Sequence, residues 1–149
     1  METQELIEKT IKDLLKFFEV GAKVKVEEKE EDTFTVAITG DDLSFLIGFH
    51  GNTLNALQVM LTNMVFKQTN KWIKILVDIN EYKDKRVEKI QEMTRHFIDK
   101  ARFFKKEVAM PPMTPWERRQ VHVLASEYLD IETESVGEGS DRHIIIKIK

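Results

Sequence analysis

The first forty residues show two different periods of apolar positions. Between residues 3 and 19, apolar side chains recur every three or four positions, which predicts an amphipathic helix that ends before Gly21. Apolar and polar residues then alternate at 24–26 and 34–38, which predicts two half-buried strands. The charged segment 27–32 between them is the turn of the expected hairpin.

The next forty residues predict two helices and a third strand. Residues 43–47 suffice for a single helical turn, and a pair of glycines then interrupts the pattern. Asn52 is expected to cap a helix whose apolar residues share one face. Residues 72–79 are almost continuously apolar, as in a central strand. The predicted order is therefore helix–strand–strand–helix–helix–strand.

The remainder of the chain predicts one long helix and a small second unit. Residues 81–106 contain no glycine or proline, and a helix of roughly 39 Å is expected to bridge two units. After a Met-Pro-Pro-Met break, Thr114, Pro115 and Glu117 form the pattern of a capping box, and the helix that they begin runs to about residue 127. Two alternating strands follow, at 131–136 and 143–148. These elements predict an α+β fold.

Composition narrows the functional classes. The chain has 149 residues, of which 42% are hydrophobic and 33% charged, as in a soluble globular protein with a charged surface. The absence of cysteine excludes disulfides, thiolate metal sites and cysteine nucleophiles. The first ten residues lack the apolar segment of a signal peptide, and no stretch approaches the ~18 apolar residues of a membrane span. We therefore expect a cytoplasmic protein without an integral membrane segment.

Charge is distributed unevenly along the chain. The net charge of −3 argues against indiscriminate binding of polyanions. Residues 1–80 hold 9 lysines, no arginine and 13 acidic residues, whereas all 6 arginines lie in residues 81–149. Arginine is the better residue for bidentate contacts with phosphate. The change in composition indicates two units with different surfaces.

The glycine pair around Phe49 and His50 is the first candidate nucleic-acid site. Gly48 and Gly51 permit a tight turn and the close approach of a phosphodiester backbone, and Asn52 starts a helix whose free N–H groups favour an anion. The alternative is an ordinary helix end followed by a helix start. Because this G-x-x-G turn lies between two helices and after two strands, the first half resembles a bacterial (type II) KH domain, in which the turn clamps a nucleic-acid backbone.

The second candidate site is an arginine–histidine pair. Arg118 and His122 are four residues apart on the expected capped helix, so both project from one face, with Arg119 adjacent. The alternative is a solvated helix face on which Arg118 pairs with Glu117 or Asp130. Spacing alone favours that alternative, and the surrounding residues favour the nucleic-acid site.

Those surrounding residues resemble a known module. The segment Pro-Met-Thr-Pro-Trp-Glu-Arg-Arg-Gln-Val-His, followed by 134–139 and Arg142, is similar to the arginine–three–histidine (R-x-x-x-H) domain that binds single-stranded nucleic acid. The match covers about residues 107–149. It implies that the two neighbouring arginines, the histidine and Arg142 contact RNA.

A third feature is a basic stretch at the end of the long helix. The segment from Arg95 to Lys106 contains five cationic residues and a single acidic residue, Asp99. Two phenylalanines lie among them. Such a stretch is usually a solvated face. The functional alternative is a phosphate track that includes Lys105 and Lys106.

The sequence offers little for catalysis. The four histidines are scattered, and no acid sits at ligand spacing beside His122 or His143. The serines lack the context of a nucleophile elbow. We therefore expect neither an enzyme nor a metal or other cofactor.

The two modules in this order resemble the Jag family of bacteria, also described as SpoIIIJ-associated or KhpB-type proteins. Residues 78–83 and Arg86, at the start of the long helix, also fit the junction of that family. The resemblance implies a KH domain over 1–80, a bridging helix over 81–106, and an R-x-x-x-H domain, a small α/β sandwich, over 107–149.

The resemblance also implies a function. Members of the family are non-catalytic regulators that bind single-stranded RNA, with single-stranded DNA as a possible ligand, and are linked to cell shape, division and sporulation. A homodimer or a heterodimer with a small KH protein is implied. Most members carry an N-terminal Jag-N domain, and this sequence begins at the KH helix, so a chain that lacks that domain is expected. The competing prediction is an adaptor whose KH domain docks a protein partner, which the acidic first half favours.

Overall fold

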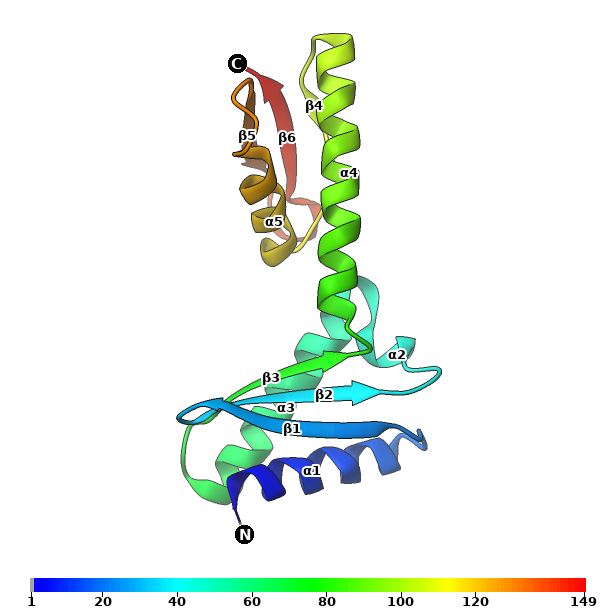
Figure 1. The fold of residues 1–149 in the computed structure, drawn as a ribbon, viewed down its shortest axis with the longest axis vertical. Helices are drawn as coiled ribbons and strands as arrows, with labels where there is room; N and C mark the ends of the chain where they lie inside the picture. Colours follow the sequence, from blue (N-terminus) through cyan, green and yellow to red (C-terminus); the bar gives the residue numbers. More distant parts are fainter. Residues whose placement is uncertain (1) are drawn as a thin grey trace. The chain divides into compact units, whose positions relative to one another are not determined.

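The computed structural model describes residues 2–149 and divides the chain into two units (Figure 1). The first unit ends at Tyr82 and the second begins at Lys83. Each unit combines helices with a three-stranded sheet, so the α+β prediction is confirmed.

The first unit is a sheet with two helices on one face (Figure 1). Its strands are β1 (Lys23–Glu30), β2 (Thr33–Thr39) and β3 (Lys74–Ile79), in the order β1-β2-β3. β1 and β2 pair antiparallel, whereas β2 and β3 pair parallel. Helices α1 (Thr3–Phe17) and α3 (Asn52–Thr69) pack on the sheet, and α2 (Ser44–Ile47) precedes α3. This is the predicted order of elements.

The core of the first unit follows from the two periods in the sequence. Val26, Val36 and Val77 are neighbours across the three strands, and all three are buried. Ile7 of α1 and Leu61 of α3 are fully buried in the same cluster. One face of the sheet and one stripe of each helix therefore form a single core.

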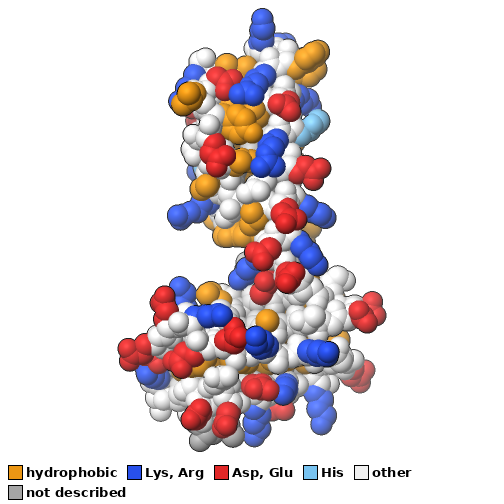
Figure 2. Space-filling model, viewed as in Figure 1, with side chains coloured by type: hydrophobic (Ala, Val, Ile, Leu, Met, Phe, Trp, Pro, Cys, Tyr) orange, Lys and Arg blue, Asp and Glu red, His pale blue; other side chains and the backbone are white. Residues whose placement is uncertain are grey.

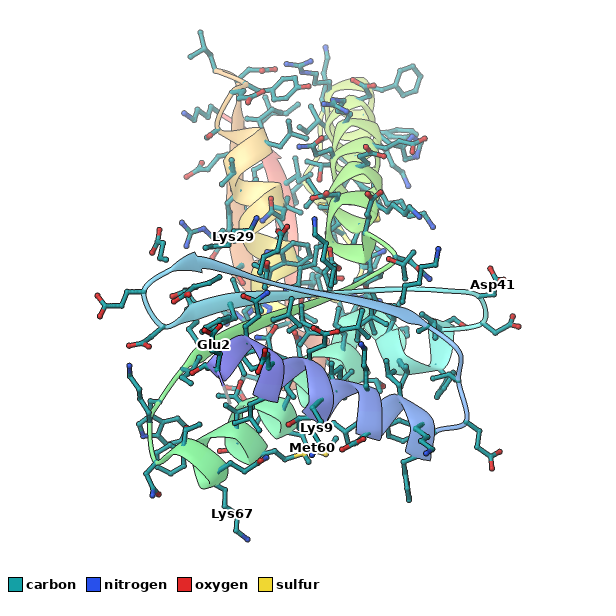
Figure 3. All side chains as sticks on the ribbon, turned by 60° about the horizontal axis from the view of Figure 1, so that its bottom comes forward. Glu2, Lys9, Lys29, Asp41, Met60 and Lys67 are labelled. Carbon is teal, nitrogen blue, oxygen red and sulfur yellow. The ribbon has the colours of Figure 1, made fainter. Side chains whose placement is uncertain are left out.

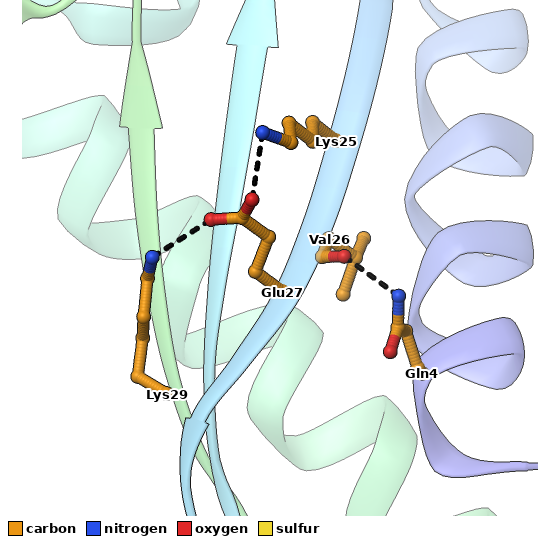
Figure 4. Close-up of polar contacts among 5 residues, drawn as sticks. All are labelled: Gln4, Lys25, Val26, Glu27 and Lys29. Atoms are coloured by element: carbon orange, nitrogen blue, oxygen red, sulfur yellow. Dashed lines mark hydrogen bonds and ion pairs between the residues drawn. The ribbon is translucent and has the colours of Figure 1, made fainter.

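Strand β1 is an edge strand, and its exposed side carries a small ion-pair chain (Figure 4). Lys25 Nζ and Lys29 Nζ lie 2.6 and 2.8 Å from the two carboxylate oxygens of Glu27, and together they lower the pKa of Glu27 to about 2. Gln4 of α1 donates to the backbone oxygen of Val26 at 2.8 Å. Charged side chains on an edge strand discourage pairing with a further strand.

The second unit packs a long helix and a shorter one on its own sheet. Helix α4 spans Tyr82–Phe104 and α5 spans Pro115–Ala125. The strands are β4 (Val108–Ala109), β5 (Ile131–Val136) and β6 (His143–Ile148), paired antiparallel in the order β4-β6-β5. Buried residues of α4, α5 and β6 share one core, which includes Ile90, Ile98, Val121, Ile144 and Ile146.

Helix boundaries differ from the prediction by a few residues. α1 ends at Phe17 rather than at residue 19. The long helix begins at Tyr82 and ends at Phe104, because Lys105 adopts a left-handed backbone with φ of 52°.

The third and fourth strands also differ from the prediction. β3 begins at Lys74 rather than at residue 72, and Trp72 lies before it, with its ring stacked on Phe66 at a centroid distance of 4.0 Å. β4 was not predicted, because Val108 and Ala109 are too few to show a period. Their pairing with Ile146 and Ile145 on β6 is a tertiary contact.

Candidate nucleic-acid interface

The G-x-x-G turn joins α2 to α3 in the first unit. Gly48 follows α2 with φ of 71° and ψ of −173°, a 3₁₀ turn spans Phe49–Gly51, and Gly51 has φ of 79°. The turn directly precedes Asn52, the first residue of α3, so it lies at the N-terminal end of that helix. Figure 3 shows Asp41 at the end of the sheet where β2 leads toward α2, and Lys67 projecting from the last turn of α3.

Both glycines are required by their surroundings. A Cβ atom on Gly48 would lie 2.1 Å from Oγ1 of Thr53, and one on Gly51 would lie 3.0 Å from Cε1 of Tyr82. The positive φ angles also favour glycine at both positions. The turn is therefore a closely packed backbone structure.

The prediction that Asn52 caps α3 is wrong. Gly51 is the N-cap residue and Asn52 is the first helical residue, with φ of −61° and ψ of −41°. Because glycine has no side chain, it gives no side-chain acceptor to the first N–H groups of α3. The N–H of Asn52 donates to the oxygen of Phe49, and the N–H groups that follow it in the first turn, with the positive end of the helix dipole, can bind an anion such as phosphate.

Phe49 and His50 form the tip of the turn. The ring of Phe49 is 78% exposed, and its centroid lies 4.0 Å from that of His50 with the planes inclined by 37°. Exposed aromatic rings next to an anion-binding turn can stack on an unpaired base. The turn thus combines a backbone site for phosphate with an aromatic surface.

In the second unit, the start of α5 is fixed by the predicted capping box, which is confirmed. The backbone N–H of Glu117 donates to Oγ1 of Thr114 at 3.3 Å, and the N–H of Thr114 donates to Oε2 of Glu117 at 3.1 Å. Glu117 is fully buried, and its Oε1 accepts from Nε of Arg86 at 2.8 Å. Arg86 thereby joins α4 to the start of α5.

Arg118 and His122 lie one turn apart on α5, and both are half-buried. Arg118 Nη1 donates to the backbone oxygen of Met113 at 2.7 Å, and Nδ1 of His122 lies 2.7 Å from Oγ1 of Thr133 on β5. Both side chains therefore have a preferred orientation set by a neighbouring element.

The carboxylates proposed as partners of Arg118 have other arginine partners. Glu117 binds Arg86, and Asp130 accepts two hydrogen bonds from Arg102, at 2.8 and 2.6 Å. Arg118 itself contacts the backbone oxygen of Met113.

Burial, and secondarily the charge of Arg118, lowers the pKa of His122 below its usual value of 6.5. Both effects disfavour the charged imidazolium. The neutral imidazole is therefore favoured, and the contact with Thr133 occupies Nδ1 of the ring.

The structure brings Arg142 to the same end of the unit as Arg118. Met113 accepts from Arg118 through its oxygen and donates through its N–H to the backbone oxygen of Arg142 at 3.2 Å. The Arg142 side chain donates to the oxygen of Gly137 at 2.8 Å. Arg119 is exposed on α5.

Lys105 and Lys106 lie elsewhere in this unit. They line a shallow hollow with Glu107, Lys147 and Ile148 at the C-terminal end of β6, whereas Arg142 precedes its first residue. Six residues of strand span roughly 20 Å. The two lysines therefore do not join the arginines in one continuous patch, and Figure 2 shows acidic and basic side chains interspersed over the visible face.

The sequence predicted neither the contacts that Arg86 and Thr133 make in this site nor the burial of the Ser135 hydroxyl. Arg86 and Thr133 are the partners of Glu117 and His122, and both come from distant segments. Oγ of Ser135 is buried without a hydrogen-bond partner among the described residues. The capping-box pattern identified Glu117 as a cap, and nothing in it indicated that this carboxylate is buried.

Among residues 2–149, no helix is long and apolar enough to cross a bilayer, and no three acidic or histidine side chains are grouped to hold a metal ion.

The fold and these two sites define a KH unit followed by an R-x-x-x-H unit. Family models agree: the KhpA/KhpB KH domain matches residues 4–79, and the arginine–three–histidine (R-x-x-x-H) domain matches residues 85–147. The chain belongs to the KhpB, or Jag, family of KH–R-x-x-x-H proteins.

Curated relatives support the assignment. The chain is 32% identical over 130 residues to RNA-binding protein KhpB of Clostridium symbiosum, covering 87% of this chain and 58% of the relative. It is 33% identical over 128 residues to RNA-binding protein KhpB of Bacillus subtilis, covering 85% of this chain and 61% of the relative. This chain thus spans about three fifths of the length of those relatives.

Proposed function

We propose that this chain is a non-catalytic regulatory protein that binds single-stranded RNA through its G-x-x-G turn and through the Arg118–His122 face of α5. The proposal rests chiefly on the start of α3, where Gly51 leaves the first N–H groups without a side-chain cap. In the second unit, Arg118, Arg119 and Arg142 supply permanent positive charge near one end of α5. The relatives named RNA-binding proteins support this function.

Two sites of moderate affinity on one chain are consistent with a binding protein. The first unit ends at Tyr82 and the second begins at Lys83, so both sites are carried by one continuous chain. Attachment raises the effective concentration of the second site once the first is occupied. We assign Lys105 and Lys106 a separate, sequence-independent contact with the phosphate backbone. We also propose that the protein acts in the bacterial cytoplasm.

A second candidate function is docking of a protein partner by the KH unit, for example another KH protein or a second copy. It is favoured by a group of exposed rings near α2. Phe17 is 81% and Phe45 is 50% exposed, and Phe18 lies between them with ring-centroid distances of 5.7 and 6.4 Å. Contiguous exposed rings are typical of interaction surfaces.

Substitutions in the G-x-x-G turn are expected to distinguish RNA binding from docking of a protein partner. Replacing Phe49 and His50 with aspartate adds two negative charges where we place phosphate, so RNA affinity should fall at least tenfold. His50→Lys should raise the affinity and steepen its dependence on salt. Fluorescence anisotropy with a labelled single-stranded RNA at several salt concentrations measures both effects.

The control has the same change in charge at another place. Lys9→Gln with Lys12→Gln alters the net charge equally on α1, and we expect at most a small loss of affinity. If the aspartate variant binds RNA as the parent does, the turn is not an RNA site and docking of a protein becomes the better function.

The pH dependence of RNA binding is expected to show whether His122 contacts phosphate. A bound phosphate favours the imidazolium, so affinity should rise as pH falls, and because the pKa of His122 is lowered in the free protein, the rise should continue below about pH 6.5. The same lowered pKa means that the unfolded chain binds the proton more readily than the folded chain. The free energy of unfolding should therefore decrease as pH falls through that range. His122→Gln should remove its part of both effects, measured by RNA titrations and melting curves between pH 5.5 and 8. Identical profiles in parent and variant would show that His122 does not contact phosphate.

A further inference from the structure

A groove of about 350 Å³ lies beside His122 in the second unit. Its walls come from the last turn of α5, the turn at Tyr128 and Leu129, and the start of β5. Tyr128, Leu129 and Ile131 give it apolar walls, and Leu129 is 92% exposed. A concave site with apolar walls and a few polar groups is the usual form of a small-ligand site.

The turn that forms one wall is held from both sides. Arg102 of α4 makes two hydrogen bonds to Asp130 and places its guanidinium carbon 5.2 Å from the ring centroid of Tyr128. The N–H of Ile131 donates to the oxygen of Tyr128 at 3.3 Å. The groove is therefore formed before any ligand enters.

The polar side of the groove is lined by His122, Ser126, Glu132, Thr133 and Lys149, and it includes the open edge of β5. The N–H of Lys149 donates to the oxygen of Asp130, and in an antiparallel pair the direction of such bonds alternates along the strand. Accordingly, the backbone groups of Glu132 and Glu134 point toward β6, and those of Thr133 point toward the open edge. Thr133 thus presents one donor and one acceptor beside the imidazole of His122, whose Nδ1 it already orients.

We propose that this groove holds one unpaired nucleobase of the bound RNA. The base packs against Leu129 and Tyr128, and its edge bonds to the backbone of Thr133, which leaves the second ring nitrogen of His122 for the adjoining phosphate. This inference rests on the proposed RNA-binding function and adds a base-binding subsite to the phosphate contacts made by the arginines.

A nucleic acid fits the groove better than a peptide does. An open strand edge could also pair with an extended peptide. However, Arg118 lies on the same face of α5, one turn before His122, and Arg119 is next to it. A rise of about 6 Å along the helix separates the phosphate-binding residue from the groove, which allows one nucleotide to contact both.

The test compares two probes that differ only in the bases: an octamer of uridylate and an abasic ribose-phosphate octamer of equal length. With the full chain at low salt, Leu129→Ser should weaken binding of the uridylate octamer about fivefold or more and leave the abasic octamer unchanged. Val123→Ser is the matched control, because Val123 is 56% exposed on α5 outside the groove, and it should change neither affinity. Arg119→Ala should weaken both probes.

Each outcome decides between the alternatives. Equal losses for both probes with Leu129→Ser, or no loss for either, would overturn the base-binding groove. If Arg119→Ala still weakens both probes in that case, RNA binding stands without the groove, and a peptide becomes the better occupant of the strand edge. If the parent binds neither probe, the proposed function fails and the subsite fails with it. Leu129 is exposed, so melting curves of the variant should match the parent.

Discussion

Replacing Glu117 with alanine is expected to lower the free energy of unfolding of the second unit by about 3–5 kcal/mol. The Glu117 carboxylate is fully buried, and it accepts from Arg86, whose side chain is only 20% exposed, and from the backbone N–H of Thr114. Without the carboxylate, the guanidinium keeps its charge in a largely buried place and loses this acceptor. The start of α5 also loses half of its capping box.

Hydrogen exchange of amides in α5 and β6 measures this loss in the second unit alone. Glu127→Ala, at an exposed position just beyond α5, is the control and should stay within about 0.5 kcal/mol of the parent. Replacing both Arg86 and Glu117 with methionine should recover part of the loss, because no buried charge then remains. A Glu117→Ala protein with parental exchange rates would contradict the structural role of this pair.

The first unit could be predicted well because its elements depend on local patterns. The helical stripe of α1 and the alternation in β1 and β2 are visible in short windows, and glycine marks the turn between α2 and α3. The boundaries that differ, at Trp72 and Lys105, depend on one ring stack and one left-handed residue, which leave no period. β4 was missed for the same reason: its identity comes from pairing with β6.

The candidate sites show the same limit. Spacing correctly placed Arg118 and His122 on one face of a capped helix. It did not predict that Lys105 and Lys106 lie at the other end of β6, because that depends on the direction of a strand forty residues later. It also did not predict the contact between Arg86 and Glu117, which are 31 residues apart. The sequence therefore predicted which side chains share a local element, but not the contacts between distant segments.

Replacing Gly48 with alanine is expected to disrupt the G-x-x-G turn. The residue has φ of 71° and ψ of −173°, a region that residues other than glycine essentially do not adopt, with a cost of about 1–3 kcal/mol. The added Cβ would also lie 2.1 Å from Oγ1 of Thr53, so the first turn of α3 must shift. Because we place phosphate on the N–H groups of that turn, the shift should lower RNA affinity at least tenfold, as well as the melting temperature of the KH unit.

Gly21→Ala is the matched control for this prediction. Gly21 lies in the same unit, and an added Cβ would meet nothing within 4 Å, so melting and RNA affinity should remain parental. Gly48→Ala combined with Thr53→Ala removes the contact with Oγ1 and keeps both the backbone cost and the 2.8 Å approach to Cβ of residue 53. The double variant should therefore regain part of the affinity if the position of the α3 N–H groups matters. If Gly48→Ala alone lowers the melting temperature and leaves RNA affinity unchanged, the turn serves the fold of the KH unit and RNA binds elsewhere.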